Sequence, residues 1–422
     1  MSALSIFAGE TFRSLRVRNF RLFFIGQLVS QAGTWMQSMS IIWVVKELTD
    51  DGVALGLATA AQFAPVLVLG AWGGVVSDRV DRHKFLQFTQ AAFLTVAIGF
   101  TVLSFTGNLT LPAIYVLSLA YGVITSLDNP ARRALVGEMV SEVDVPNAVG
   151  LNSALMTGSR VVGPAVAGVL ISTVGEEWAF LANSLTFVAI IGALAMMKRS
   201  EFRSPPVVPR KKGQLIEGLR YTWSTKELRL TFILLAVVGT LAFEFQVSLP
   251  LLADRSLNGG PIVFTTLYSV MSLGSVIGAL FVARRSDVDP SFLAWSALGL
   301  SVTMAALALA PTTLLAFIAV FPVGFAMVFL LSGSNAVIQL RADPAMRGRV
   351  LALTAVVFLG STPIGGPIVG AVAEAYGARA GVALGAIASG LVAVWVLWQL
   401  RRVEVPATQS NTHRAAADVH VA

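Results

Sequence analysis

The chain of 422 residues has no cysteine, only three histidines and little charge, because Asp, Glu, Lys and Arg together make up 13 % of it. Without cysteine it can form no disulfide, thiol nucleophile or cysteine-ligated metal site. The histidines, His83, His413 and His420, have no paired ligands beside them. No Gly-rich loop ending in Lys-Ser or Lys-Thr occurs, so nothing indicates ATP use. These absences argue against an enzyme, a cofactor and a metal.

Long apolar stretches fill most of the chain. Hydrophobic residues make up 55 % of it, and the mean hydropathy is +0.76. About 20 apolar residues span the hydrocarbon core of a bilayer as a helix, and such a helix satisfies its own backbone hydrogen bonds. We therefore predict an all-α polytopic membrane protein with twelve spans: residues 20–47, 53–76, 84–106, 112–130, 147–174, 178–197, 229–252, 262–283, 291–310, 312–338, 347–374 and 378–400.

One long polar interval divides these spans six and six. The units we expect are an N-terminal six-helix bundle, a cytoplasmic linker, a C-terminal six-helix bundle and a disordered cytoplasmic tail, at residues 1–197, 198–228, 229–400 and 401–422.

The linker contains apolar residues at helical spacing, namely Leu215, Ile216, Leu219 and Trp223. This spacing predicts a short amphipathic helix on the membrane surface. An ordinary solvated helix is the alternative.

The net charge of +7 would suit a nucleic-acid binder, but the placement of the charges argues otherwise. With the N-terminus in the cytoplasm, the only Lys and Arg that fall outside cytoplasmic segments are Lys46, Arg160, Arg255 and Arg379. This is the positive-inside bias of membrane proteins. It predicts a plasma membrane protein (the inner membrane of a bacterium) with both termini cytoplasmic, a lipid bilayer as partner and no nucleic acid.

Two stretches at equivalent places in the halves are similar. Residues 129–133 (Asn-Pro-Ala-Arg-Arg) precede one Gly/Pro-rich span, and residues 335–349 precede another. Related helical halves are typical of transporters that bind substrate near the midplane, between the halves. The duplication therefore predicts movement of a small molecule across the membrane.

A short motif follows the second predicted span. The stretch from Gly74 to Lys84 resembles the signature of the major facilitator superfamily, and the matching residues are Gly74, Asp78, Arg79 and Arg82. It departs from the signature at Asp81, where the family usually has Gly, and at His83. The motif, the twelve predicted spans and the two related halves together make a resemblance that covers nearly the whole chain.

The charges of this motif suggest a conformational latch. A carboxylate is stabilised at the positive N-terminal end of a helix, and the resemblance implies that Asp78 faces the start of span 11. We predict that Arg82 pairs with Asp128 at the inner end of span 4, and that this network latches the outward-facing state on the cytoplasmic side. The alternative is that these charges only fix loop positions and topology.

The fifth span carries Gly158, Gly163, Pro164 and Gly168. They resemble the Gly-Pro antiporter motif of proton-coupled exporters, although Gly158 is one residue further from Gly163 than in the family and only one Gly ends the motif. Glycines let helices approach closely, and a proline can kink a helix. Ordinary packing of small residues is the alternative.

Residues 128–140 and 147–170 further resemble the drug/proton antiporter subgroup, which includes macrolide and siderophore exporters. The resemblance implies twelve helices in two pseudo-symmetric bundles, acting as a monomer. It also implies secondary active efflux of small amphiphilic or lipophilic compounds by proton antiport through alternating access. A lysophospholipid or metabolite facilitator of the same superfamily and a non-transporting membrane sensor are the alternatives.

The superfamily lines its cavity with spans 1, 4, 7 and 10, and polar residues occur on each of these spans. A large cavity with few fixed charges suits a lipophilic substrate, including a cationic or zwitterionic one. For any single aromatic residue, lipid contact or helix packing is the alternative. The candidates are Gln27, Gln31, Thr34, Trp35, Ser38, Tyr121, Thr240, Phe243, Phe325, Ser332, Asn335 and Gln339.

Two ionisable residues, Arg160 and Glu244, lie well inside predicted spans. A charge there costs at least ~2.5 kcal/mol, so each residue needs a partner or wet surroundings. Because a partly dry cavity favours the neutral form of a carboxyl group, we predict that Glu244 carries the exchanged proton. Arg160 either tunes proton release or binds helix-end carbonyls. A hydrated Glu244 near the outer membrane surface is the alternative.

Overall fold

The computed structural model describes residues 10–203, 214–282 and 289–404, and these residues form helices without any strand. The helices of the first half are α2 (Arg18–Thr49), α3 (Gly52–Ser77), α4 (Arg82–Phe105), α5 (Leu111–Glu138), α6 (Val145–Thr173) and α7 (Glu176–Ala195). Three-residue or four-residue 3₁₀ turns flank them at η1 (Arg13–Arg16), η2 (Glu142–Asp144) and η3 (Arg199–Glu201).

The second half has six spans of its own. Its first span is divided into α9 (Lys226–Leu241), α10 (Phe245–Leu251) and the π-helical turn η4 (Leu252–Ser256). The others are α11 (Pro261–Val282), α12 (Pro290–Leu309), α13 (Thr313–Arg341), α14 (Arg347–Tyr376) and α15 (Ala378–Glu404).

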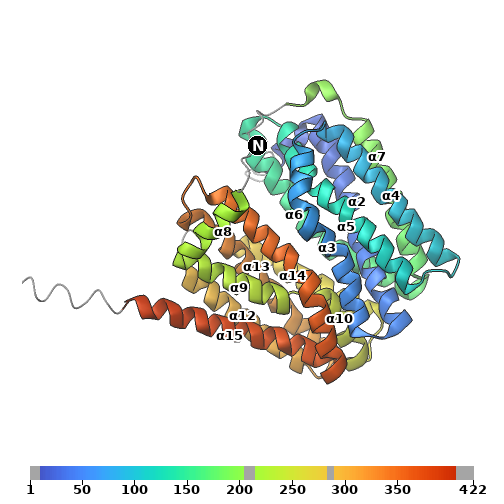
Figure 1. Cartoon of the computed structure of the whole chain (residues 1–422). Helices are drawn as coiled ribbons and strands as arrows, with labels where there is room; N and C mark the ends of the chain where they lie inside the picture. Colours follow the sequence, from blue (N-terminus) through green and yellow to red (C-terminus); the bar gives the residue numbers. More distant parts are fainter. Residues whose placement is uncertain (1–9, 204–213, 283–288, 405–422) are drawn as a thin grey trace, which may run out of the picture.

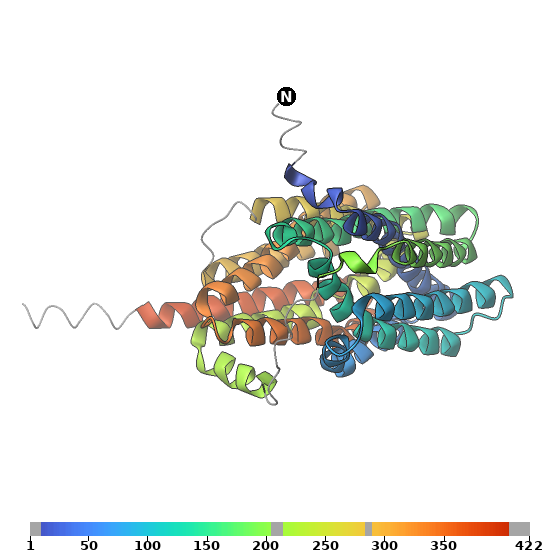
Figure 2. The same cartoon turned by 90° about the horizontal axis from the view of Figure 1, so that it is seen from above.

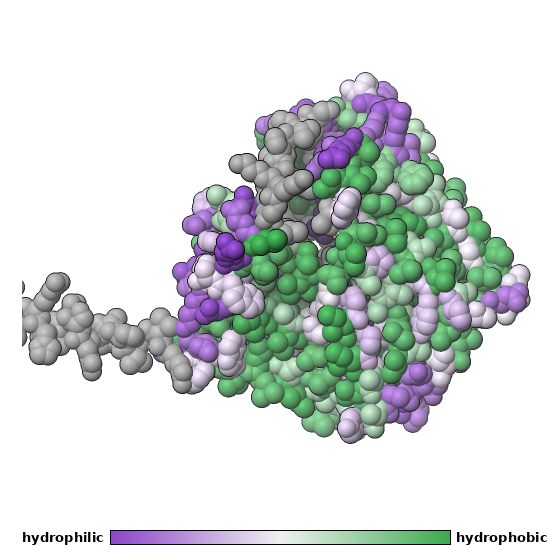
Figure 3. Space-filling view, viewed as in Figure 1, coloured by the Kyte–Doolittle hydropathy of each residue, from purple (hydrophilic) through white to green (hydrophobic). Residues whose placement is uncertain are grey.

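Eleven segments of the described residues are long and apolar enough to cross a membrane, with α9, α10 and η4 counted as one. The twelfth long helix is α2, whose 32 residues include polar side chains such as Gln27 and Gln31. Large apolar side chains, among them Trp72, Leu309 and Leu391, are exposed on the surface. Figure 3 shows a broad apolar band between hydrophilic ends of the molecule. The predicted fold of twelve membrane helices is therefore confirmed.

The amphipathic helix expected in the linker is α8 (Gln214–Ser224). Ile216, Leu219 and Trp223 are exposed on it, and Glu217 forms an ion pair of 2.7 Å with Arg349 of α14. The first part of the linker (204–213) and most of the expected disordered tail (405–422) lie outside the described residues.

The two halves lie side by side, with the first half in blue to green and the second in yellow to red (Figure 2). In Figure 1 they diverge at the end where α8 lies and meet at the end where α10 lies. We call the first the basic end, which carries the α3–α4 turn, α8 and the start of α14. We call the second the far end, which carries the α2–α3 turn and η4.

Candidate functional site

Ion pairs join the two halves at the far end. Lys46 Nζ of the first half lies 2.5 Å from Asp254 Oδ2 of the second. Within the second half, Arg255 Nη1 lies 3.0 Å from Glu374 Oε2. Arg255 also reaches across to Asp50, with 3.4 Å between its Nε and the carboxylate Oδ1. The same Glu374 carboxylate accepts a hydrogen bond from the backbone N–H of Gly52 at 3.2 Å. The α2–α3 turn is thus tied to η4 and to the end of α14.

Glycines bring the backbones of α3 and α14 into contact beside these ion pairs. A Cβ added to Gly370 would lie 2.0 Å from the carbonyl oxygen of Gly52, and one added to Gly56 would lie 2.5 Å from that of Gly366. A side chain at either place would collide with backbone, which cannot move aside cheaply. Close approach through small residues is how membrane helices gain packing energy, so this crossing closes the far end.

At the basic end the ion pairs stay within one half. Among the described residues, Arg82–Glu138 and Arg199–Asp81 belong to the first half. Arg341–Glu227 (3.2 Å) and Arg349–Glu217 (2.7 Å) belong to the second. Ion pairs between the halves therefore lie at the far end, and no described ion pair crosses between the halves at the basic end, where they diverge (Figure 1).

The predicted pairing of Arg82 with Asp128 is wrong. Arg82 forms ion pairs with Glu138 and, at 3.3 Å, with Asp78. Asp128 pairs with Arg132 at 3.2 Å and accepts hydrogen bonds from Thr89 (2.7 Å) and Gln90 (2.8 Å). The sequence reading ended span 4 at residue 130, whereas α5 continues to residue 138. Because α4 and α5 are antiparallel, the start of α4 faces Glu138, and Asp128 lies about 15 Å deeper at 1.5 Å per residue.

The remaining motif residues lie at the turn between α3 and α4. Asp78 caps the C-terminus of α3, and its backbone N–H donates to the carbonyl of Gly74 at 3.2 Å. Gly74 is buried, and Arg79 is exposed at the basic end. The contact of Asp78 with the start of α14 stays a prediction.

The cavity candidates differ in exposure. Gln27 and Ser38 are buried, and Asn335 and Gln339 are exposed. Those that are partly exposed are Gln31, Thr34, Trp35, Tyr121, Thr240, Phe243, Phe325 and Ser332.

Two of these candidates belong to a network in the first half. Gln31 donates to the side-chain oxygen of Gln27 at 3.4 Å, and Arg132 donates to the same oxygen at 3.2 Å. Phe325 instead packs between α11 and α13, with its ring 4.6 Å from that of Phe329 and 5.7 Å from that of Phe281.

Glu244 lies at a break in the first span of the second half, between α9 and α10, where it is the N-cap residue of α10. The sequence predicted one unbroken span (229–252). Two glycines from distant helices pack on the break. A Cβ at Gly365 would lie 1.9 Å from the carbonyl oxygen of Thr240, and one at Gly385 would lie 2.8 Å from the Cα of Ala242. Because no Gly or Pro stands at the break itself, the local sequence carries no signal for it.

The carboxyl group of Glu244 is buried, with 3 % of the residue exposed. Its Oε1 atom has no hydrogen-bond partner, and the hydroxyl of Thr362 on α14 faces the group. Within the described part of the chain no Lys or Arg forms an ion pair with it. A buried carboxyl group with no cation beside it favours the neutral, protonated form.

Arg160 lies midway along α6, with its guanidinium carbon 5.1 Å from the centre of the Trp35 ring. That ring is 5.7 Å from the ring of Tyr268 on α11, so this contact joins the halves. Ser269 of α11 also donates to the carbonyl of Val161 at 3.0 Å. Tyr268 lies within electrostatic range of both Arg160 and Glu244.

The glycine motif of α6 has two different parts. A Cβ at Gly163 would lie 2.5 Å from the Cβ of Trp35, and one at Gly168 would lie 2.0 Å from Thr265 Oγ1. Gly163 thus brings α6 against α2, and Gly168 brings α6 against α11 of the other half. Pro164 is buried between them, whereas a Cβ at Gly158 would meet open space.

Two polar residues on α6 were missed by the sequence reading. Ser153 is exposed and Thr157 partly exposed, and both share a helix face with Arg160. Ser153, Thr157 and Arg160 are spaced i, i+4 and i+7, which places them on one face of a helix. This spacing could have identified Ser153 and Thr157 from the sequence.

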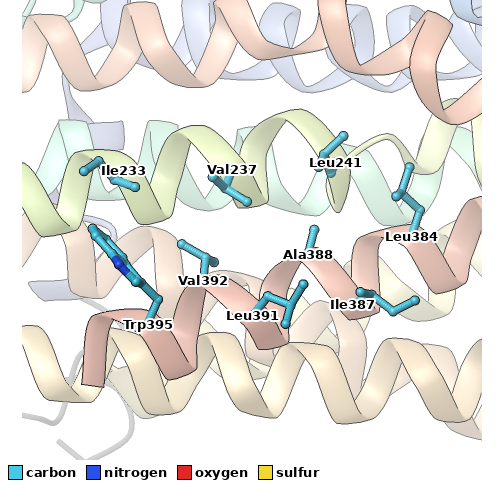
Figure 4. A pocket seen from close by; sticks show the side chains of 9 residues that line it. All are labelled: Ile233, Val237, Leu241, Leu384, Ile387, Ala388, Leu391, Val392 and Trp395. Atoms are coloured by element: carbon cyan, nitrogen blue, oxygen red, sulfur yellow. The ribbon is translucent and has the colours of Figure 1, made fainter. Parts of the chain in front are cut away.

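An apolar groove of about 570 Å³ lies elsewhere, between α9 and α15 (Figure 4). It runs from Ile233 and Trp395 to Leu241 and Leu384, and only apolar side chains line it. Ile387, Leu391 and Trp395 are exposed there, as expected of a surface that faces lipid. Substrate pockets generally add a few polar groups to orient the ligand, so this groove is not the candidate site.

Comparison with known proteins agrees with this architecture. A family model described as "Transmembrane secretion effector" matches residues 9–421. The enterobactin exporter EntS of Escherichia coli is 26 % identical over 91 % of this chain and 92 % of its own. The macrolide efflux protein A of Streptococcus pyogenes is 25 % identical over 82 % and 87 %. The staphyloferrin A transporter of Staphylococcus aureus is 23 % identical over 63 % of this chain and 66 % of its own.

Solved structures share the fold at low identity. A bacterial homologue of the human lysosomal transporter Spinster, in an inward-facing and unoccupied conformation, has a TM-score of 0.69 at 14 % identity. That similarity covers 90 % of this chain and 95 % of the other. The nucleoside transporter NupG has a TM-score of 0.70 at 14 % identity, covering 90 % and 99 %.

Proposed function

Because the chain belongs to the transmembrane secretion effector family of the major facilitator superfamily, we propose that it exports small amphiphilic molecules by alternating access. The family and the relatives named above are transporters, not enzymes. The observation that carries the proposal is the asymmetry between the two ends. Ion pairs and glycine contacts join the halves at the far end, whereas no described ion pair crosses between them at the basic end, where they diverge (Figure 1).

The positive-inside bias supports a cytoplasmic location for the basic end. The chain then lies in a bacterial inner membrane with both termini in the cytoplasm, and the opening accepts cargo from inside the cell. Rocking of the halves closes the basic end, separates the far end and releases the cargo outward. The relatives support macrolide-like or siderophore-like cargo, and a monomer contains the whole pathway.

Proton exchange is assigned to Glu244. Ionisable residues buried inside membrane spans commonly mark proton pathways, and no described Lys or Arg forms an ion pair with Glu244. Its place between α9 and α10 lets a small movement of either segment change its contact with water. The group would then lose its proton to the cytoplasm and regain one from outside, which drives export with the proton gradient. Arg160 would contribute to proton exchange through the electrostatic effect of its charge on Tyr268, on which Glu244 also acts.

The test is cargo uptake into inside-out vesicles, with an imposed pH gradient and a panel of a macrolide, a catecholate siderophore and a lysophospholipid. Glu244→Gln is expected to lower gradient-driven uptake at least tenfold while gradient-independent exchange continues. The control is Glu142→Gln, because Glu142 is exposed at the basic end. Full gradient-driven uptake by the Glu244→Gln variant would contradict the proton role. Uptake that ignores the gradient in the unmodified protein would indicate a facilitator, and binding without uptake would indicate a sensor.

A further inference from the structure

Arg160 is a cation midway along α6, next to a ring contact between the halves. The ring contact of Trp35 with Tyr268 crosses between the halves, as does the stacking of Trp43 with Phe264 (6.3 Å) nearer the far end. Among the described residues, Trp35–Tyr268 is the cross-half ring contact nearest the basic end. A molecule that enters from the basic end therefore meets Trp35 and Arg160 where the halves close.

The neighbours of Arg160 on α6 show which way it faces. Gly163 and Ala167 are buried on the side that packs against α2, and Val161 and Gly168 contact α11. Val162, Val166 and Val169 are exposed on the opposite side of the helix. At 100° per residue, Arg160 lies between the α2 and α11 sides and away from the valines. It therefore faces the space between the halves, not the lipid.

Among the residues that the structure describes, no carboxylate forms an ion pair with this guanidinium. Arg160 forms no ion pair within the described ranges, and its contact there is with the face of Trp35. Arg132, the other Arg near this space, already pairs with Asp128 at 3.2 Å. A cation this deep in a membrane protein is costly unless it has a partner. Ser153 and Thr157 line the approach to it from the basic end.

We propose that Arg160 binds an anionic group of the cargo, a carboxylate or an ionised phenol, while Trp35 contacts an aromatic or apolar part next to that group. The proposal names the substrate class and rests on the export function proposed above. It does not depend on proton exchange at Glu244.

The chemistry fits the geometry in two ways. A guanidinium has a planar fork of N–H donors that binds carboxylates through two parallel hydrogen bonds. The contact with the face of the Trp35 ring is not a hydrogen bond, so it does not use the N–H donors of the guanidinium. Once the basic end is cytoplasmic, a membrane potential that is negative inside also favours outward movement of an anion.

The experiment measures binding to the purified full chain by calorimetry, with 1-naphthoate and its neutral isostere 1-naphthamide as probes. We expect the unmodified protein to bind naphthoate at least tenfold more tightly. Arg160→Gln should reduce the preference to less than twofold with naphthamide affinity unchanged, and Arg160→Lys should keep a reduced preference. The control is Arg341→Gln, which removes an equal charge at the basic end and should keep the preference intact.

The possible failures can be distinguished. An Arg160→Gln variant that still prefers naphthoate would overturn the proposal, as would equal loss of both probes, which would mark Arg160 as structural. If the vesicle assay shows export but the unmodified protein binds no naphthoate, the anion site is wrong and the export function stands. If no cargo moves in vesicles while naphthoate binds through Arg160, the export function is wrong and the anion site stands.

Discussion

At the far end, charged residues and glycines join the two halves, whereas at the basic end each described ion pair closes on its own half. The far-end residues come from the α2–α3 turn of one half and from η4 and α14 of the other. At the basic end, Arg82 pairs with Asp78 and Glu138 of its own half. The same kinds of side chain therefore connect the halves at one end and stabilise each half separately at the other.

The two kinds of far-end contact differ in expected strength. Exposed ion pairs contribute about 0.2–1 kcal/mol each and weaken with salt. Asp50 and Glu374 are well exposed, with 61 % and 45 % of their side chains accessible. The glycine contacts allow backbone to meet backbone, and no side chain can replace them without separating α3 from α14. Packing should therefore hold this end closed more than charge does.

The largest effect is expected from Gly56→Leu. Its side chain would enter the space taken by the Gly366 backbone, only 2.5 Å from a Cβ. We expect at least a tenfold loss of uptake in vesicles and an opened far end. Because the chain has no cysteine, Ser256→Cys adds a single thiol there, and its alkylation rate should rise at least fivefold.

The matched control for this variant is Gly192→Ala, where an added Cβ meets nothing within 4 Å. It should change neither uptake nor alkylation. Normal alkylation and normal uptake in the Gly56→Leu variant would show that the glycine crossing does not hold the far end.

A smaller change is expected from Arg255→Gln, which removes the pairs with Asp50 and Glu374. Only the pair with Asp50 crosses between the halves, and one exposed pair at about 0.2–1 kcal/mol predicts about 1.4- to 5-fold faster alkylation of a cysteine introduced by Ser256→Cys. When Arg255 is intact, high salt should also raise the alkylation rate of this cysteine, by a smaller amount. Arg341→Gln breaks a pair within one half at the basic end and should leave the rate unchanged. An equal rise in both variants would remove the distinction between the two ends.

The sequence predicted the twelve spans, the two halves and the glycine-rich helices, because length, apolarity and small residues are local signals. In the sequence, Lys46, Arg160 and Arg255 are recognisable only as exceptions to the positive-inside bias. Two of these pair across the halves at the far end, and the third lies over the Trp35 ring. Their partners come from other helices, so no spacing in the sequence reveals them. The break before α10 was missed for the same reason, since Gly365 and Gly385 that pack on it are more than 100 residues away.

The smallest expected effect concerns the corrected partner of Arg82 at the basic end. In a double-mutant cycle on thermal unfolding of the purified protein, Arg82→Gln and Glu138→Gln should be coupled by about 0.5–1.5 kcal/mol, because contacting residues are not additive. Arg82→Gln and Asp128→Asn should be additive within about 0.5 kcal/mol, since Asp128 binds Arg132, Thr89 and Gln90 instead. The alkylation rate of the cysteine introduced at position 256 should change in neither the Arg82→Gln nor the Glu138→Gln variant, because the Arg82–Glu138 pair lies within one half. Strong coupling of Arg82 to Asp128 would instead mean that the two meet in another conformation, and that the basic end also rearranges its ion pairs during transport.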